Sequence, residues 1–286
     1  MPQFEVPEVD FSRYSNRQLA GPPFAVLVLA VLVIAGWYVT TGTPVALGTE
    51  FTGGTELRVV VPGGDVNPRA PFEATVETVQ PIQQAPNSYI LTFGPEADTE
   101  TLRQQAKAAG FEVVSVQSTS ATFAESTQRL ALYGVVIAFI GMSIVIFALF
   151  RSAVPSGAVV ISAFGDIVVP VALMNLLGMK LSLGTVAALL MLIGYSVDSD
   201  ILLTNHVLRR TGGFYESVRR AMRTGVTMTL TSLSAMAVMA VVATLFGIQL
   251  LSTIGTVLVF GLATDLVNTY MLNLSLLRWY VYEGVA

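Results

Sequence analysis

Residues 189–203 read Leu189-Leu190-Met191-Leu192-Ile193-Gly194-Tyr195-Ser196-Val197-Asp198-Ser199-Asp200-Ile201-Leu202-Leu203, an apolar run that holds two aspartates. A carboxylate at the centre of a membrane-spanning helix costs about 2.5–3.5 kcal/mol on insertion scales. Packing does not explain two such groups, so Asp198 and Asp200 need water, a partner group or a proton. The run therefore predicts a membrane protein whose function lies within the membrane.

The composition of the whole chain predicts the same class. Of its 286 residues, 53% are hydrophobic and 12% are charged, whereas soluble domains carry about 25% charged residues. The mean hydropathy is +0.68 and the pI is about 5.0. Cysteine is absent, which excludes disulfides and cysteine-ligated metal sites. Lys107 and Lys180 are the only lysines, which indicates either a high-salt organism or a GC-rich genome that favours arginine codons.

Six apolar runs approach or exceed the length needed to cross a bilayer, which takes about 20 residues. They lie at 24–41, 130–150, 153–177, 181–204, 226–246 and 250–277. We expect an N-terminal segment at 1–21, a first span at 22–41 and a large loop domain at 42–128. Five further spans at 129–277, with a cytoplasmic loop at 205–225, and a C-terminal segment at 278–286 complete this polytopic α-helical membrane protein.

The basic residues of the short connections predict the orientation of the spans. Nine arginines lie on one side of them, namely Arg13, Arg17, Arg151, Arg209, Arg210, Arg219, Arg220, Arg223 and Arg278. Short loops rich in lysine and arginine stay in the cytoplasm. We therefore expect a multi-pass protein of the cell membrane with both termini cytoplasmic and residues 42–128 external.

The segment 42–128 has the patterns of a small α+β domain. Alternating apolar residues predict strands at 55–61, 88–93 and 111–118, with a turn at 62–65. Residues 71–80 and 98–109 are predicted to be helices, giving the order β-α-β-α-β of a ferredoxin-like fragment. The segment holds ten acidic and four basic residues, and this negative charge argues against nucleic-acid binding. It could contact polypeptide or simply stay soluble.

Four carboxylates fall within predicted spans: Asp166, Asp198, Asp200 and Asp265. None has an arginine or lysine at helical neighbour spacing within the membrane. Burial without a cation favours the neutral form of a carboxyl group, which can exchange a proton when a water path opens. These four residues are our candidates for ion or proton coupling. The alternative is a set of neutral acids that only hydrogen-bond neighbouring helices.

Helical geometry separates the two aspartates of the fourth span. Residues two apart point about 200° apart around a helix. One of Asp198 and Asp200 should therefore face the bundle of this chain, and the other a partner or a water-filled groove.

The last two spans carry polar residues at helix-face spacing: Thr227, Thr231 and Ser234, then Asn268 and Thr269 beside Asp265. Such groups form interhelical hydrogen bonds worth roughly 0.6–2 kcal/mol each, or else they line a hydrated path. Metal-ligand spacing and a nucleophile with a neighbouring base are both absent from the sequence. We therefore expect neither an enzyme nor a bound cofactor or metal.

Three motifs resemble the SecF family of protein-export membrane proteins. The family motif Gly-Ile-Asp-Phe-x-Gly-Gly-Thr corresponds to Gly48-Thr49-Glu50-Phe51-Thr52-Gly53-Gly54-Thr55. A third-span motif resembles Ala163-Phe164-Gly165-Asp166-Ile167, with glycine in place of histidine. The fourth-span motif Ile-Gly-Tyr-Ser-Ile-Asn-Asp-Thr corresponds to 193–200, where Gly194 and Tyr195 match. There Asp198 replaces asparagine, Ser199 replaces the usual acid and Asp200 replaces threonine. The local pattern Val197-Asp198-x-x-Ile201-Leu202 resembles the SecD version, which suggests a divergent, archaeal member.

The resemblance implies a function and a set of partners. Members of the SecD/SecF branch of the resistance-nodulation-division superfamily pair as SecD and SecF to promote polypeptide export, drawing on the proton-motive force. The implied partners are SecD, the Sec translocation channel, the translocating polypeptide and membrane lipid. By analogy with SecD, Asp198 is the first candidate for ion coupling and Asp166 its neighbour. The alternatives are half of a proton-driven small-molecule or lipid exporter, and a structural scaffold.

Overall fold

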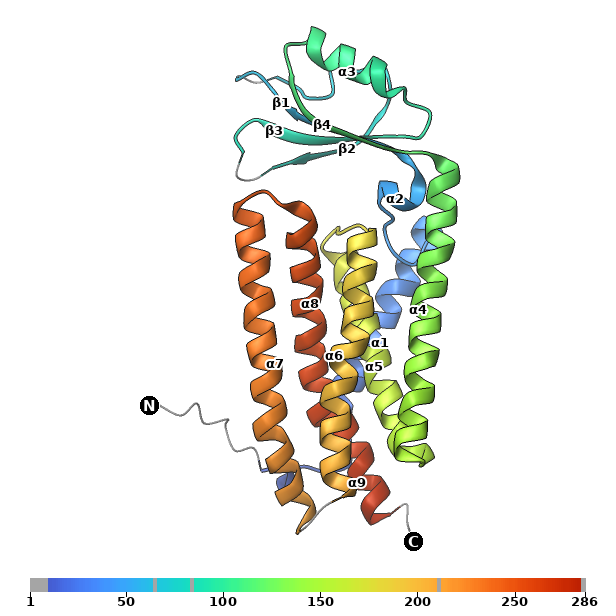
Figure 1. The fold of residues 1–286 in the computed structure, drawn as a ribbon, viewed down its shortest axis with the longest axis vertical. Helices are drawn as coiled ribbons and strands as arrows, with labels where there is room; N and C mark the ends of the chain where they lie inside the picture. Colours follow the sequence, from blue (N-terminus) through green and yellow to red (C-terminus); the bar gives the residue numbers. More distant parts are fainter. Residues whose placement is uncertain (1–9, 64–65, 83–84, 210–211, 284–286) are drawn as a thin grey trace, which may run out of the picture.

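The computed structural model describes residues 10–63, 66–82, 85–209 and 212–283 and shows a helical bundle with a small domain at one end (Figure 1). Within these residues six helical spans are long and apolar enough to cross a membrane, which confirms the predicted fold class. They are α1 (Asn16–Thr41), α4 (Ala121–Phe150), α5 (Ala153–Leu176), α6 (Leu183–Leu208), α7 (Phe214–Leu245) and a last span formed by α8 (Gln249–Val267), the π-helix η2 (Asn268–Asn273) and α9 (Leu274–Tyr282). Two residues of the predicted turn at 62–65, Gly64 and Asp65, lie outside the described residues, as does Arg210.

Several helices are longer than the apolar runs that predicted them. Helix α1 begins at Asn16, where Ser15 and Gln18 form a capping box, and α4 begins at Ala121. Hydropathy marks only the part of a helix that lies in the hydrocarbon region, so polar first turns escape it.

The loop predicted at 205–225 is too long, because both flanking helices extend into it. Helix α6 continues to Leu208 and α7 begins at Phe214, which leaves 209–213 as the connection. Apolar residues continue at helical spacing along the first turns of α7 and are buried, namely Phe214, Val218, Ala221 and Met222. The arginines between them face outward, so an amphipathic helix forms where the charge count predicts a loop.

The α+β domain, which we define as residues 42–120, contains a four-stranded antiparallel sheet. Its elements are α2 (Thr49–Thr52), β1 (Gly54–Val60), β2 (Val76–Pro81), β3 (Ser88–Phe93), α3 (Thr99–Ala108) and β4 (Glu112–Thr119), with strand order β2-β3-β1-β4. The predicted helix at 71–80 is wrong, because residues 76–81 pair with β3. Val76, Thr78 and Val79 are β-branched and favour a strand. After the single-turn helix α2, the domain therefore has the order β-β-β-α-β.

Helix α3 covers one face of the sheet and completes a small core. Leu57 and Val59 of β1, Leu91 and Phe93 of β3, and Leu102 of α3 are almost fully buried in it. Because side chains alternate along a strand, Glu56 and Arg58 lie on the opposite face, which looks toward the end of the bundle (Figure 1).

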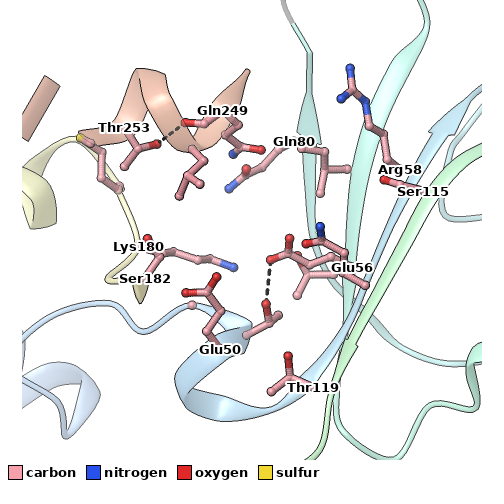
Figure 2. Close-up of a pocket in the computed structure, with 18 of the residues that line it drawn as sticks. Glu50, Glu56, Arg58, Gln80, Ser115, Thr119, Lys180, Ser182, Gln249 and Thr253 are labelled. Atoms are coloured by element: carbon pink, nitrogen blue, oxygen red, sulfur yellow. Dashed lines mark hydrogen bonds between the residues drawn. The ribbon is translucent and has the colours of Figure 1, made fainter. Parts of the chain in front are cut away.

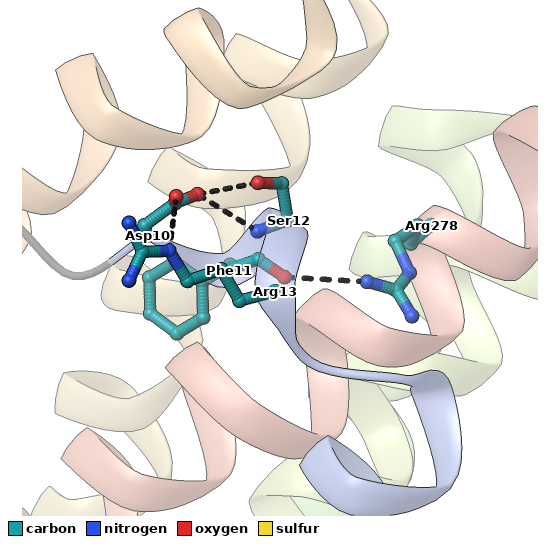
Figure 3. Close-up of polar contacts among 5 residues, drawn as sticks. All are labelled: Asp10, Phe11, Ser12, Arg13 and Arg278. Atoms are coloured by element: carbon teal, nitrogen blue, oxygen red, sulfur yellow. Dashed lines mark hydrogen bonds and ion pairs between the residues drawn. The ribbon is translucent and has the colours of Figure 1, made fainter.

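Helices α5 and α6 form the centre of the bundle, while α1, α4 and α7 are mostly exposed. The end of the bundle opposite the domain is fastened by Arg278 of α9. Its guanidinium donates a hydrogen bond to the carbonyl oxygen of Tyr14 at 2.7 Å. It donates another to the carbonyl oxygen of Phe11 at 3.4 Å (Figure 3). Beside them, hydrogen bonds from Ser12 lower the pKa of Asp10, which also pairs with Arg13 at 3.0 Å.

Candidate functional site: a buried acid cluster

Three of the four predicted carboxylates meet inside the bundle. Asp166 of α5, Asp200 of α6 and Asp265 of α8 have exposed fractions of 0%, 0% and 1%. Within the described part of the chain, none of the three forms an ion pair with an arginine, lysine or histidine. We call these residues the acid cluster, together with the side chains that bond them: Ser196, Ser199, Asn268, Thr269 and Asn273.

Asp166 is held by two side chains from two other helices. Its Oδ2 accepts a hydrogen bond from the hydroxyl of Ser196 at 2.5 Å, and its Oδ1 accepts one from Nδ2 of Asn268 at 2.7 Å. Gly165 makes room for this contact, since a Cβ at that position would lie 2.7 Å from Nδ2 of Asn268. The absence of a side chain at position 165 therefore leaves space for the amide of Asn268 beside α5.

Asp200 and Asp265 are joined through hydroxyl groups. Oδ1 of Asp200 accepts from Oγ1 of Thr269 and from Nδ2 of Asn273, both at 2.8 Å. Oδ1 of Asp265 lies 2.8 Å from Oγ of Ser199 and 3.2 Å from Oγ1 of Thr269. The two hydroxyl oxygens are themselves 3.2 Å apart. Asp200, Thr269, Ser199 and Asp265 thus form one continuous chain of short oxygen contacts.

This series of oxygen contacts has more hydrogen-bond acceptors than hydroxyl protons. A serine or threonine hydroxyl donates only one hydrogen bond. Suppose that Thr269 donates to Asp200 and Ser199 donates to Asp265. The contact between the two hydroxyl oxygens, and the contact between Thr269 and Asp265, then have no proton between their oxygens. A proton on one of the carboxyls would supply a missing donor, and the hydroxyls could turn to pass the bonds along. In addition, Oδ2 of Asp200 is buried without a partner among the described residues.

Both amide groups of the acid cluster and one of its three hydroxyl groups come from a π-helical stretch. Asn268, Thr269 and Asn273 all belong to η2, which interrupts the last span between α8 and α9. Single π-helical turns occur frequently at functional sites. The predicted pair Asn268 and Thr269 therefore does bond between helices, as interhelical polar groups were expected to do.

Asp198 lies outside the acid cluster. It is exposed on the outer face of α6, together with Gly194 and Tyr195, while Asp200 is fully buried. The prediction that the two aspartates lie on different faces of the helix is confirmed. Asp166, which the resemblance placed beside Asp198, instead hydrogen-bonds Ser196 on the buried face of α6.

The hydroxyl groups predicted on the fifth span also face outward. Thr227, Thr231 and Ser234 donate to carbonyl oxygens of their own helix, at 2.8, 2.8 and 2.7 Å. They make no interhelical hydrogen bond within the described residues. Among those residues there is likewise no group of three or more histidines, cysteines or acids placed to hold a metal ion.

The Gly-Gly-Thr motif forms the turn into β1. Gly53 and Gly54 have φ values of +77° and +124°, which side-chain-bearing residues rarely adopt. Thr55 is buried, and its hydroxyl bonds that of Ser118 on β4 at 3.0 Å. These residues shape the α+β domain and lie away from the acid cluster.

Sequence reasoning missed three members of the cluster, Ser196, Ser199 and Asn273. Asn273 follows Thr269 by four residues and Ser196 precedes Asp200 by four, so both lie on the helix faces of predicted site residues. That spacing was the available signal. Ser199, beside Asp200 in the sequence, joins the cluster through a different side of α6.

Residues 98–283 match the family described as protein export membrane protein SecD/SecF, C-terminal. The chain is 63% identical to the protein-export membrane protein SecF of Haloferax volcanii, covering 100% of this chain and 99% of that protein. It is 60% identical to the SecF protein of Haloquadratum walsbyi, over the full length of both proteins. It is 38% identical to the SecF protein of Methanocaldococcus jannaschii, over 91% of this chain and 94% of that protein. The prediction of a halophile fits the first two organisms.

A solved structure has the same fold. SecDF, a translocon-associated membrane protein from Thermus, matches 97% of this chain with a TM-score of 0.72. The chain spans 40% of the length of that protein, and the sequence identity is 17%, so this likeness concerns the fold alone.

Proposed function

Because the chain belongs to the SecF proteins of the SecD/SecF protein-export family, we propose that it uses the acid cluster to couple an ion gradient to polypeptide export. Family membership itself gives the chain a role in protein export as a multi-pass membrane protein. In our proposal it acts with a SecD-like chain beside the Sec translocation channel, and promotes the passage of the translocating polypeptide.

The observation that carries the ion-coupling proposal is the burial of three carboxylates at the meeting of α5, α6 and α8, with no cationic side chain paired to them among the described residues. Such groups inside a membrane are expensive, so they persist where a function requires them. The shortage of hydroxyl protons between Asp200 and Asp265 gives the cluster a use for an added proton. One charge crossing 100 mV releases about 2.3 kcal/mol, enough for a few ions to bias a conformational equilibrium.

The outer face of α6 supports the proposed partner. Asp198 is a poor group to expose to lipid, and it shares this face with Met191 and Tyr195, whose exposed fractions are 43% and 40%. A second helical bundle would cover the face and give Asp198 polar company. Asp198 thus remains a candidate for ion coupling, at the contact with SecD rather than in the acid cluster.

The arrangement of arginines supports the proposed orientation. The termini of the bundle and the connections after α4 and α6 lie at the end opposite the α+β domain (Figure 1). The arginines of the short connections lie at that end, while Lys180 lies at the domain end. We therefore place the arginine-rich end of the bundle in the cytoplasm. The α+β domain then lies outside the cell, beside the lipid headgroups.

Replacing Asp200 by Asn tests the role of the cluster, because Asn keeps the shape but cannot take up or release a proton. We expect export of a signal-bearing reporter to fall to the level of cells that lack this chain, with an unchanged amount of folded complex. Thr231→Val, which removes an outward hydroxyl bonded to its own helix, is the control and should export normally. Normal export by Asp166→Asn, Asp200→Asn and Asp265→Asn alike would sink the proposal.

A further inference from the structure

The segment that leads from α1 into the α+β domain is fastened to the connection between α5 and α6. The backbone N–H of Gly48 donates to the carbonyl of Leu181 at 2.8 Å, and the N–H of Leu181 donates to the carbonyl of Ala46 at 2.6 Å. Leu47 and Leu181 thereby form a parallel bridge. A Cβ on Gly48 would lie 2.9 Å from the Leu181 carbonyl, so the close approach requires glycine.

Two side chains extend this attachment to the helices themselves. The carboxylate of Glu50 accepts a hydrogen bond from the N–H of Leu183, the first residue of α6. That N–H has no partner within its helix, and the positive end of the helix dipole favours a carboxylate there. Asn175 of α5, exposed by only 2%, donates to the carbonyl of Pro44 at 2.9 Å and accepts from the N–H of Ala46 at 3.3 Å.

Within the described residues, the end of the α7–α8 hairpin has no such hydrogen-bonded attachment. A cavity of about 630 Å³ lies between the bundle and the open face of the sheet, and positions 247–253 line part of it. Gln80 of β2 and Gln249 of α8 extend into this cavity from opposite walls (Figure 2). Among the described residues, no hydrogen bond or ion pair joins positions 246–253 to the α+β domain. The domain is thus hydrogen-bonded to α5 and α6. Toward the α7–α8 turn, the guanidinium of Arg58 lies 3.6 Å from the place that a Cβ on Gly247 would take, with no hydrogen bond to the turn among the described residues.

The acid cluster straddles the same division. Asp166 and Asp200 belong to α5 and α6, whereas Asp265 belongs to α8 and its companions Asn268 and Thr269 to η2. The bonds from Asn268 to Asp166 and from Thr269 to Asp200 cross from one group of helices to the other. Any sliding of α5 and α6 against the last span must stretch or exchange these bonds.

We infer that Glu50 and Asn175 are positioning residues that make the α+β domain move as one body with α5 and α6, against α7 and α8. Displacement of the domain into the cavity then changes the bonds of the acid cluster, and changes in the cluster displace the domain. The consequence for export rests on the proposed ion coupling. The division into two bodies is independent of it.

Cross-linking tests the division, because the chain has no cysteine of its own. One variant carries Gln80→Cys with Gln249→Cys, across the cavity. The matched control carries Thr78→Cys with Lys180→Cys, since Nζ of Lys180 lies 3.5 Å from Oγ1 of Thr78, on the same strand as Gln80. Both pairs are joined in membranes, in the assembled complex, by a bismaleimide with a reducible disulfide, and single-cysteine variants show any reaction with other chains.

We expect the Gln80–Gln249 link to stop export and a reductant to restore it, while the Thr78–Lys180 link leaves export unchanged. Normal export with the first link, or an equal loss with both, would overturn the inference. If the first link blocks export but all three cluster Asp→Asn variants export normally, ion coupling fails and the division stands. If the aspartate variants fail to export and the Gln80–Gln249 link leaves export unchanged, ion coupling stands and the division into two bodies fails.

Substitutions of Glu50 test the attachment itself. Glu50→Ala should speed hydrogen exchange of the Leu183 amide about tenfold or more, as loss of a bond to a charged group predicts, and should lower export. Glu50→Gln keeps an acceptor oxygen and should restore part of both. Glu56→Ala is the control, since Glu56 lines the same cavity and its carboxylate, among the described residues, accepts a side-chain hydrogen bond only from Thr49 of its own domain, at 3.0 Å. Faster exchange in Glu50→Ala with normal export would show that the attachment does not serve export.

Discussion

Two adjacent glycines determine the path of the chain into the α+β domain. Gly53 and Gly54 both have positive φ values, and an added Cβ on Gly54 would overlap the carbonyl oxygen of Phe93 on β3. The neighbouring strand therefore leaves no room for a side chain, whatever the local backbone energy. This steric requirement gives the Gly-Gly-Thr motif a structural reason that does not depend on family resemblance.

Gly54→Ala should destabilise the α+β domain by more than about 1 kcal/mol, because alanine is strained at this φ and displaces β3. Protease cleavage within residues 42–120 of the full chain, under native conditions, would measure the loss as faster cutting. Gly63→Ala is the control, since its nearest foreign atom would be 3.9 Å away. Equal cleavage rates for the two variants would show that the turn adapts to a side chain.

Residue spacing predicts that Asp198 and Asp200 lie on different faces, but not which of them is buried. Helix α6 carries apolar and polar residues on both its inner and its outer face, so its own sequence does not mark the inner face. The ligands of Asp200, Thr269 and Asn273, lie about seventy positions further along the chain. The burial of Asp200 therefore depends on how α6 packs against η2. Neither the sequence of α6 nor that of η2 predicts it alone.

At the scale of whole elements, the long apolar helices and three of the four strands could be predicted, because their periodicity is local. The failures lie at 71–80 and 205–225. Strand β2 is an edge strand that depends on its pairing with β3. The first turns of α7 depend on burial of Phe214 and Val218 against other helices. In both places tertiary contacts outweigh weak local preference.

Close packing of α7 on α8 rests on a small residue. A Cβ on Gly255 would lie 3.0 Å from the backbone nitrogen of Ala240 on α7, and backbone cannot move aside as a flexible side chain can. We expect Gly255→Ala to force the two helices apart and cost about 1–3 kcal/mol. Thermal unfolding of the purified protein would show this as a lower transition temperature.

Gly141→Ala provides the comparison, because nothing within 4 Å would meet a Cβ on that residue of α4. There alanine should be neutral, or stabilising by about 0.5–1 kcal/mol through the better helix propensity. A Gly255→Ala protein as stable as Gly141→Ala would mean that α7 and α8 are loosely packed, contrary to the contact geometry.

The whole molecule presents an incomplete exterior for a membrane protein. Helices α1, α4 and α7 expose broad apolar faces that suit lipid, but the outer face of α6 carries an aspartate beside Gly194 and Tyr195. In our proposal, this aspartate, on the helix that also bears Asp200, marks the face on which a second bundle docks. Small residues at such a face allow close approach of the partner helix.

Gly194→Leu should therefore weaken the complex without disturbing this chain, because no other atom lies within 4 Å of the place its Cβ would take. Pull-down from solubilised membranes would recover at least about tenfold less of the SecD-like chain, the loss expected when about 1.4 kcal/mol of binding energy is removed. Gly36→Leu on α1, whose Cβ also meets nothing within 4 Å, should leave recovery unchanged. Undiminished recovery with Gly194→Leu would move the docking surface to another face and leave Asp198 to be explained by water alone.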